Sequence, residues 1–179
     1  MLSIERTHAA VIACYASPQA LDSLPSIPGA HACRVAPDEL LLIAPPARRA
    51  DTERRAAEHF TIMDATALVF DQSDGWTGFT LRGDEALTVF SQLSAIPLPT
   101  TRPAFVQGAM AGGAAKVLLL NQVVHVLVPL TLRQHVAARL HDVCASRAIV
   151  PDTEIAFTSD PPTPIEPSRR DAVAARRLA

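Results

Sequence analysis

The spacing of apolar residues predicts a chain in which short strands alternate with helices. Residues 8–15 (HAAVIACY) and 39–44 (ELLLIA) are continuous apolar runs of strand length, which is the pattern of a strand covered on both faces. Proline follows both runs and is expected to end the strands, because it cannot donate to a hydrogen-bond ladder. Further strands are predicted at 32–35, 66–70, 76–81, 114–120 and 123–128.

Two helices are predicted in the first half of the chain. The first is a short helical piece at 19–24, and the second covers 47–60, where glycine and proline are absent and helix formers dominate. Charged residues occupy most faces of the second helix, so we expect it to be exposed on one side. Its predicted inward residues are Ala47, Ala50, Ala57 and Phe60.

Two more helices are predicted in the second half. The first opens at Gly83, and the acidic residues Asp84 and Glu85 are expected in its first turn, where the helix dipole favours negative charge. The second covers 132–145, with Thr131 as its N-cap. The predicted buried stripes are Ala86, Leu87, Phe90 and Leu93 in the first helix and Leu132, Val136, Leu140 and Val143 in the second.

Three connections carry turn signals. The polar segment 71–75 has the composition of a hairpin turn, and Asp71 and Asp74 are interpreted as turn residues that bond the local backbone. The pair at 121–122 predicts a tight hairpin between two strong strands. Glycines 108, 112 and 113 are interpreted as positions of bending or close backbone approach, since no phosphate-binding motif surrounds them.

An internal repeat of the element pattern predicts the fold class. The segment from Glu39 and the segment from Val123 each contain an apolar strand, a proline and then an Arg/Ala-rich helix. Each is preceded by a strand and a shorter helix, so the chain has the order β-α-β-β-α, an extra strand, then β-α-β-β-α. This order predicts an α+β fold of two ferredoxin-like units packed together.

The internal repeat also predicts the domain organisation. We expect one α+β domain over 1–149, with similar halves at about 8–60 and 66–147. Residues 150–179 contain five prolines and two Arg-Arg pairs without strong periodicity. They are predicted to be a C-terminal tail, in which 168–178 forms a helix only against a partner or the domain.

Composition excludes several function classes. Apolar residues make up 49% of the chain and charged residues 19%, which suits a packed globular domain. The net charge of −2 and the aromatic content of 4% disfavour a nucleic-acid binder. Apolar runs such as 117–120 are far shorter than a membrane span of about 18 residues. No secretory signal is expected, because the N-terminus lacks a basic region followed by an apolar one.

The titratable residues do not form a recognisable catalytic motif. Cysteines 14, 33 and 144 are interpreted as buried free thiols, so we expect a reducing, cytoplasmic location. The six histidines are expected at the surface or at interfaces, because none has the spacing of a helical metal pair. The lone lysine, Lys116, is interpreted as an edge or interface charge. We therefore predict no catalytic, cofactor-binding or metal-binding residue in this chain.

A set of ordered segments resembles a known family. The segments are VAPDELLLIAP, DQSDGWTGFTLRGDEALTVFSQLSAIPL, AKVLLL and LRQHVAARLHDV. Over residues 35–146 they resemble the gamma subunit of heterotetrameric sarcosine oxidase, which is similar to the folate-binding aminomethyltransferase domain of the glycine cleavage system. The most specific part is the pattern D-x-S-D-G-x-x-x-x-x-L-x-G-D-E-A from Asp71 to Ala86.

The resemblance implies a structural subunit of a flavoenzyme complex that oxidatively demethylates an N-methyl amino acid such as sarcosine. It implies large partner subunits that carry FAD, FMN, NAD and tetrahydrofolate, while this chain binds none of them. Aminomethyltransferases place an acidic pair at the start of the strand after the glycine-bearing loop, and the matching positions here are Ala115 and Lys116. A methyl group and a cation do not stabilise developing positive charge, so we expect no activity from the chain alone.

Arginine dominates the basic residues and is expected to contact acidic partner surface. The predicted interface residues are Arg48, Arg49, Arg54, Arg55, Lys116, Arg169, Arg170, Arg176 and Arg177. Two alternatives remain open from the sequence. One is a free-standing folate-binding one-carbon protein, and the other is an unrelated ferredoxin-like scaffold or regulatory module.

Overall fold

The computed structural model describes residues 2–121, 123–146 and 163–164. The chain divides into two compact units. Unit 1 joins the N-terminal residues through His8 to the chain from Asp74 to Thr163, and unit 2 contains Ala9–Ser73. The predicted tail helix at 168–178 lies outside the described residues.

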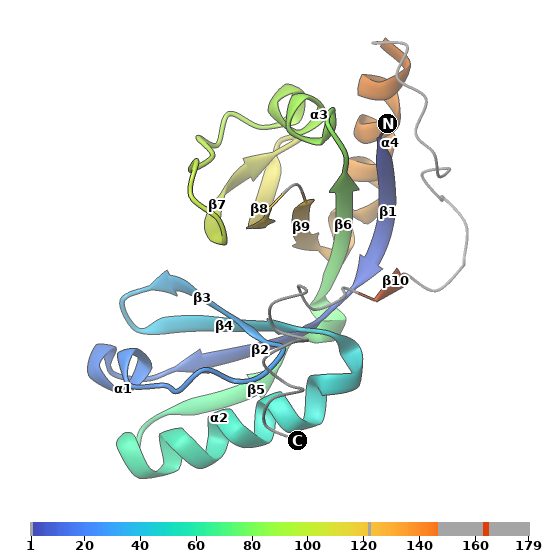
Figure 1. Ribbon diagram of the computed structural model, residues 1–179. Coiled ribbons are helices and arrows are strands. Elements are labelled where there is room, and N and C mark those ends of the chain that lie inside the picture. Colours follow the sequence, from blue (N-terminus) through green and yellow to red (C-terminus); the bar gives the residue numbers. More distant parts are fainter. Residues whose placement is uncertain (1, 122, 147–162, 165–179) are drawn as a thin grey trace. The chain divides into compact units, whose positions relative to one another are not determined.

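Unit 2 is built on a four-stranded antiparallel sheet with the order β3-β4-β2-β5 (Figure 1). Its helices follow the first and third of its strands in chain order. The elements are β2 (Ala10–Tyr15), α1 (Pro18–Asp22), β3 (His31–Ala36), β4 (Glu39–Ala44), the 3-10 turn η1 (Pro46–Arg48), α2 (Arg49–Met63) and β5 (Leu68–Asp71).

The connectivity of unit 2 is that of a ferredoxin-like fold. In chain order the elements are β-α-β-β-α-β, and the last strand lies beside the first at the edge of the sheet. Alternation along β2 turns Ile12 and Cys14 toward both helices, where they pack with Ala56 and Phe60. Burial of this apolar face against α1 and α2 forms the core of the unit.

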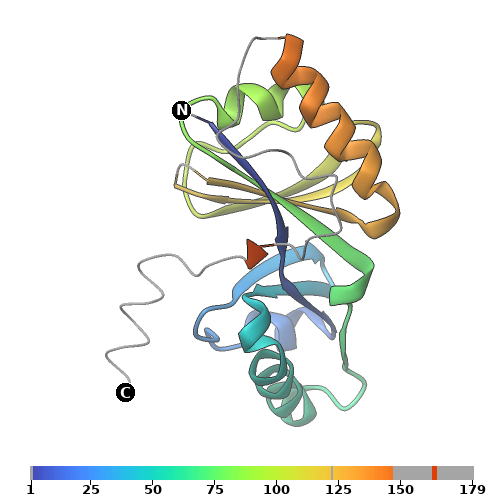
Figure 2. The same ribbon diagram turned by 90° about the vertical axis from the view of Figure 1, so that its right-hand side faces the viewer.

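Unit 1 contains a larger antiparallel sheet with the order β10-β1-β6-β9-β8-β7. Figure 2 shows α4, drawn in orange, along one side of this sheet. The elements are β1 (Ser3–His8), β6 (Trp76–Arg82), α3 (Ala86–Leu93), β7 (Ala104–Met110), β8 (Gly113–Leu120), β9 (Val123–Pro129), the 3-10 turn η3 (Leu130–Leu132), α4 (Arg133–Ser146) and β10 (Thr163–Pro164).

Unit 1 repeats the ferredoxin-like plan with one strand taken from the other end of the sequence. Strands β6, β8 and β9 with helices α3 and α4 correspond to β2, β3 and β4 with α1 and α2. The fourth position, beside β6, is filled by β1, whose Ile4 is fully buried with Phe79 and Leu81. The predicted α+β class with two ferredoxin-like units is therefore confirmed. The pattern did not predict β1 or the additional strand β7.

The inward face of α2 differs from the prediction. Phe60 is buried as predicted, but Ala47 and Ala50 are exposed and Ala57 is half-buried, and the other buried residues are Thr52 and Ala56. The helix begins at Arg49 after a 3-10 turn, and residues four apart then share its buried face. Because charged residues occur all around this helix, its apolar pattern was too weak to locate that face.

Helix α3 also begins later than predicted. Glu85 is its N-cap and Asp84 precedes it, so neither acid lies in the first turn. A turn closed by the amide of Ala86 donating to the carbonyl of Gly83 sets this start. As a result Leu87 is 46% exposed, while Val89 is fully buried.

Helix α4 begins at Arg133, because the residues before it form the 3-10 turn η3. Thr131 lies within that turn and is not the N-cap of α4, contrary to the prediction. Val136 and Leu140 are buried as expected. The other fully buried positions are Ala137 and Cys144, while Leu132 and Val143 pack only partly against the core.

Two predicted turns have different outcomes. The tight hairpin is confirmed, because β8 pairs with β9 and Asn121 has a φ of 47°. The segment 71–75 is not a hairpin turn, because β5 and β6 belong to different sheets. Asp71 still bonds the local backbone as predicted, since its carboxylate accepts from the amide and the hydroxyl of Ser73.

The glycines around β7 and β8 behave as predicted. Gly112 has a φ of 83° in the turn between the two strands. A Cβ added at Gly108 would lie 2.7 Å from Cγ1 of Ile96, and one at Gly113 would lie 2.3 Å from Cδ1 of Leu132. Both positions therefore permit close approach of another segment to the sheet.

Candidate functional site

Ala115 and Lys116, which the resemblance aligns with the acidic pair of aminomethyltransferases, lie near the start of β8. Ala115 is 2% exposed and packs in the core of unit 1. Lys116 points to the other face, where its Nζ donates to Oε1 of Gln107 on the neighbouring strand β7. At this point of the sheet β8 therefore contributes the cation of Lys116 and β7 contributes the amide of Gln107.

The predicted arginine interface on α2 is bound to carboxylates of its own unit. Arg54 Nη1 donates to Glu58 Oε1 at 2.7 Å, and Arg55 Nε donates to Asp51 Oδ2 at 2.9 Å. The hydrogen bond from Arg55 holds the pKa of Asp51 below its usual range. Such exposed pairs contribute little to stability, but they compensate the positive charge of the helix.

The remaining predicted interface residues are divided between η1, the start of α2 and the tail. Arg48 Nη1 lies 3.9 Å from Asp51 Oδ2, and Arg49 forms an ion pair with Asp71 of β5. Burial alone raises the pKa of Asp71, but the hydrogen bonds from Ser73 and Arg49 outweigh that effect and lower it. The arginines at 169, 170, 176 and 177 lie outside the described residues.

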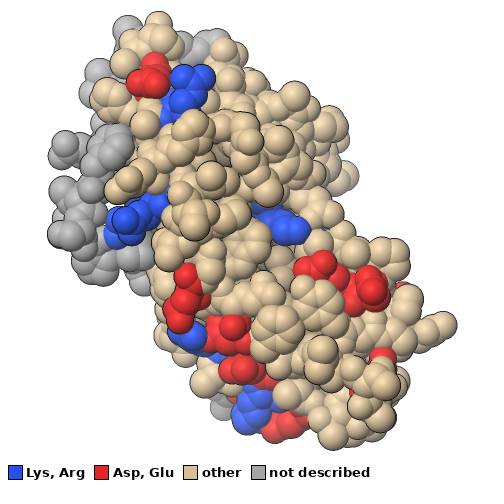
Figure 3. All heavy atoms as spheres, turned by 180° about the vertical axis from the view of Figure 1, so that it is seen from behind, with Lys and Arg blue, Asp and Glu red and all other residues tan. Residues whose placement is uncertain are grey.

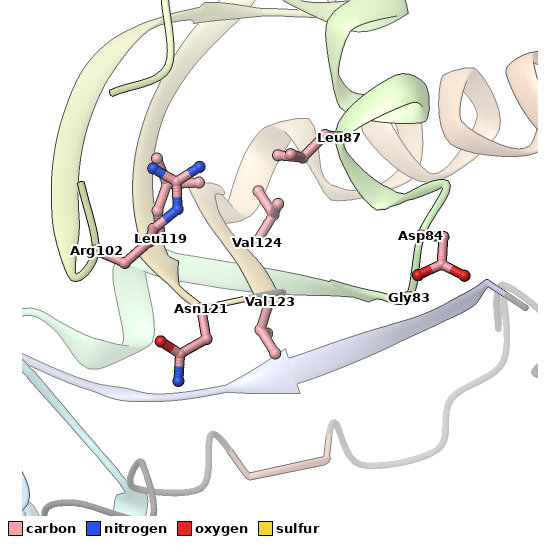
Figure 4. A pocket seen from close by; sticks show the side chains of 8 residues that line it. All are labelled: Gly83, Asp84, Leu87, Arg102, Leu119, Asn121, Val123 and Val124. Carbon is pink, nitrogen blue, oxygen red and sulfur yellow. The ribbon is translucent and has the colours of Figure 1, made fainter. Parts of the chain in front are cut away.

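One hollow of unit 1 has a volume of about 250 Å³. Figure 4 shows Arg102 and Asn121 on one side of it and Asp84 on the other. The guanidinium of Arg102 donates to the carbonyls of Pro99 and Thr101, so part of its donor capacity serves its own loop. The rest of the lining is the apolar set Leu87, Leu119, Val123 and Val124 together with Gly83.

A buried polar ladder crosses three strands of unit 1. Thr80 Oγ1 on β6 donates to Thr7 Oγ1 on β1 at 3.2 Å and lies 2.8 Å from Nδ1 of His125 on β9. The hydroxyl of Thr80 thus bonds a neighbour on each side, and the protonation of Nδ1 of His125 decides which of the two atoms donates in the second contact. His125 is 3% exposed and buried in the core of unit 1, so the expectation of a surface or interface position is wrong for this histidine.

A second hollow, of about 330 Å³, lies in unit 2 and carries acidic groups. Its lining includes Tyr15, Asp38, Asp64 and Leu68. Asp64 accepts from the amide of Ser17 at 2.7 Å and from the amide and hydroxyl of Thr66 at 2.9 and 2.7 Å. These bonds, the one from Ser17 foremost, hold the pKa of Asp64 well below its usual range, so its carboxylate stays ionised.

The space-filling view shows how charge is distributed on this unit. In Figure 3 one group of acidic side chains is interspersed with Lys or Arg side chains, and a second group lies at the right of the view. The second group lies on the side where Figure 1 draws the turn between β3 and β4. Sequence reasoning missed the acidic surface around Tyr15, Asp38 and Asp64, because the fold brings it together from three separate segments of the chain.

The cysteines are free and buried, as predicted. Burial raises the pKa of Cys14 and of Cys33 to about 12, and it also raises the pKa of Cys144. Among the described residues, no group of three or more His, Cys, Asp or Glu side chains is placed to hold a metal ion. No helix in the same residues is long and apolar enough to cross a membrane.

Comparison with solved structures places this arrangement among known folds. A chain of the heterotetrameric sarcosine oxidase from Corynebacterium sp. U-96, solved in complex with pyrrole 2-carboxylate, matches with a TM-score of 0.68 and 15% identity. The match covers 85% of this chain and 87% of that chain.

A second similar structure is aminomethyltransferase T of the glycine cleavage system from Bartonella henselae. It matches with a TM-score of 0.56 and 14% identity, over 78% of this chain and 45% of that chain. No protein-family model matches the sequence, and neither does any curated protein. At these identities the two structures establish the fold, which is that of an aminomethyltransferase-like domain.

Proposed function

We propose that this chain is a non-catalytic structural subunit of a multi-subunit, cytoplasmic flavoenzyme complex of the sarcosine oxidase kind. The complex would oxidatively demethylate an N-methyl amino acid. Its FAD, FMN, NAD and tetrahydrofolate would be bound by large partner subunits, and this chain would serve assembly.

The observation that carries the proposal is the extent of the likeness to a sarcosine oxidase chain. It covers 85% of this chain and 87% of the other, so it involves both ferredoxin-like units. The aminomethyltransferase match spans 45% of the other chain.

Residues on β8 support the structural role. Aminomethyltransferase-like chemistry requires a carboxylate that stabilises developing positive charge on the amine, and Ala115 and Lys116 stand at the matching positions. A cation there opposes such charge, and the side chain of Lys116 is bonded to its neighbour Gln107. The substitution favours a domain that kept the fold and lost the reactive group.

Reconstitution tests the proposal. The large subunits encoded by the genes that flank this one are expressed with and without this chain, and assembly is followed by size-exclusion chromatography with flavin absorbance. We expect a stable flavin-containing complex only when the chain is present. Equal assembly and equal oxidation of sarcosine without the chain would contradict the proposal.

Calorimetry with tetrahydrofolate separates the proposal from a free-standing folate-binding protein. We expect no heat of binding from the isolated chain at millimolar ligand. Saturable binding would favour the folate protein instead, and it would remove the reason for assigning the cofactor to partner subunits.

A further inference from the structure

One edge of unit 2 combines exposed apolar side chains with acidic groups. The apolar residues, which we call the β5 edge patch, are Leu68 and Phe70, and they are 61% and 41% exposed. Both lie on β5, which is the outermost strand of its sheet, and they point away from α2, because Val69 between them packs on the helix side. Neighbouring exposed apolar side chains on an edge strand mark an interaction surface.

Strand pairing places acidic groups beside this patch. On one face of the sheet, Glu39, Tyr15 and Leu68 are aligned across β4, β2 and β5. The hydroxyl of Tyr15 donates to Glu39 at 3.1 Å, and the ring of Tyr15 stacks on Phe70 with centroids 5.7 Å apart. Tyr15 therefore joins the acidic groups to the apolar ones in one continuous surface.

The negative charge of this surface is not compensated within the described chain. Within residues 2–121 and 123–146, Asp38, Glu39 and Asp64 form no ion pair with Arg or Lys. The bonds that Asp64 accepts come from neutral donors, so they fix the carboxylate without cancelling its charge. The arginines of α2, by contrast, are already paired with carboxylates of their own unit.

The register of β5 also leaves backbone groups turned outward. The amide of Gln72 donates to the carbonyl of Val11 at 2.8 Å, and the amide of Val11 donates to Oγ of Ser73 at 2.9 Å, so the backbone groups of Val11 and Gln72 point toward each other's strand. Bonded and non-bonded pairs alternate in an antiparallel ladder, so Asp71 and Val69 are non-bonded positions opposite Ile12 and Cys14. Their backbone N–H and C=O groups therefore point away from β2, where another strand is able to pair.

We propose that β5 is the docking strand for an extended, basic segment of a partner chain. The segment adds to the sheet beside β5, places apolar side chains on Leu68 and Phe70, and places Lys or Arg beside Asp38 and Asp64. The identification of the partner as a subunit of the complex rests on the proposed function, whereas the chemistry of the surface does not. A second copy of this chain is disfavoured as the partner at β5, because its acidic groups would lie against the same acidic groups of the first copy and repel them.

The first test uses the assembled complex. Leu68→Glu puts a charge where the partner's apolar side chain would lie, and Asp38→Lys reverses the charge that its cation would meet. We expect each variant to weaken association about tenfold or more, while the matched controls Leu130→Glu and Asp84→Lys, both in unit 1, leave it unchanged. Retention of wild-type association by both β5-edge variants would overturn the inference.

The second test uses the isolated full chain and does not depend on the complex. A short peptide of alternating Val and Lys is titrated by NMR, with a peptide of alternating Val and Glu as its matched control. We expect saturable shifts of the Leu68 and Val69 amides with the first peptide only, weakened by Asp38→Lys at unchanged melting temperature. No shift at millimolar peptide, or equal shifts with both peptides, would overturn the inference.

The outcomes separate the two proposals. If the basic peptide binds but no flavin-containing complex forms, the proposed function is contradicted and the docking role of β5 is supported. A flavin-containing complex that assembles equally well with Leu68→Glu would support the proposed function and contradict the docking strand. Dimerisation through β5, or at least tenfold tighter peptide binding after removal of residues 165–179, would show that the chain itself occupies the surface and would contradict the inference.

Discussion

At the scale of single residues, the most informative group is the buried hydroxyl of Thr80. It bonds both Thr7 and His125, so one side chain ties β6 to the strands on either side of it. Buried polar groups of this kind specify register, because a slipped strand would leave them without their bonds.

Thr80→Val is expected to destabilise the chain by about 1–3 kcal/mol, because it keeps the shape of the side chain and removes both hydrogen bonds. Urea unfolding followed by circular dichroism measures the change. Thr101→Val, at an exposed position, is the control and is expected to change the free energy of unfolding by less than about 0.5 kcal/mol. Equal stability of the two variants would contradict the role given to Thr80.

The cysteines give a second residue-scale prediction. With the pKa of Cys14 and Cys33 raised to about 12, the thiolate is scarce at pH 8, and iodoacetamide is expected to leave both unmodified in the folded chain. The unfolded chain in guanidinium should react at both. The raised pKa also implies that stability is kept below about pH 8.5 and lost as the pH rises toward 12. Rapid labelling of the folded chain, read by mass spectrometry, would contradict this burial.

At the scale of elements, the attachment of β1 to β6 is the distinctive step of the fold. Gly78 lies opposite Thr7 in this pairing. A Cβ at Gly78 would lie 2.5 Å from Oγ1 and 3.1 Å from the backbone oxygen of Thr7, so the two strands approach too closely for any larger residue. The N-terminal segment thus completes a unit whose other strands lie far along the sequence.

Gly78→Ala is expected to destabilise the chain by about 1–3 kcal/mol, because β1 must move away from β6 to make room for the methyl group. Gly75→Ala is the matched control, since nothing lies within 4 Å of the Cβ it would add. Thermal unfolding should show a lower melting temperature for the first variant only. Equal melting temperatures would mean that β1 does not pack on β6 as described.

The sequence predicted those elements that have strong local patterns. The continuous apolar runs gave β4 at its observed bounds and β8 and β9 within a residue. It missed β1 and β7, because both lie toward the outside of the sheet and mix polar with apolar residues. It also misplaced the inward face of α2, where charge surrounds the helix.

The candidate sites were harder to predict from the sequence than the strands, because they depend on contacts between distant segments. Ala115 and Lys116 were found only by resemblance, since nothing in their local pattern indicates a lost carboxylate. The surface of Glu39, Tyr15 and Leu68 depends on the pairing of three strands, and local periodicity does not determine strand order. The ion pairs of Arg54 and Arg55 follow from helical spacing and were predictable, and they change what those arginines offer to a partner.

At the scale of the whole molecule, two surfaces are candidates for the binding site of a partner. The arginine surface of α2 remains a prediction, and the β5 edge patch is the alternative that the structure offers. Exposed charges that already have partners influence mainly the rate of association and its salt dependence.

The double variant Arg54→Gln/Arg55→Gln compares the two surfaces. We expect it to change the affinity for the partner less than about threefold, because it removes charges that are compensated within α2. Surface plasmon resonance with the assembled partner subunits measures affinity and association rate at low and high salt. A larger loss than that caused by Leu68→Glu would assign the interface to α2.

The central claim is that this chain works as one subunit of a flavin-containing assembly. The most direct measurement is native mass spectrometry of the tagged chain, purified after co-expression with the subunits encoded beside it. We predict one species whose mass contains this chain together with flavin-bearing large subunits. A chain recovered only by itself, with the flavoprotein complete and active without it, would contradict the claim.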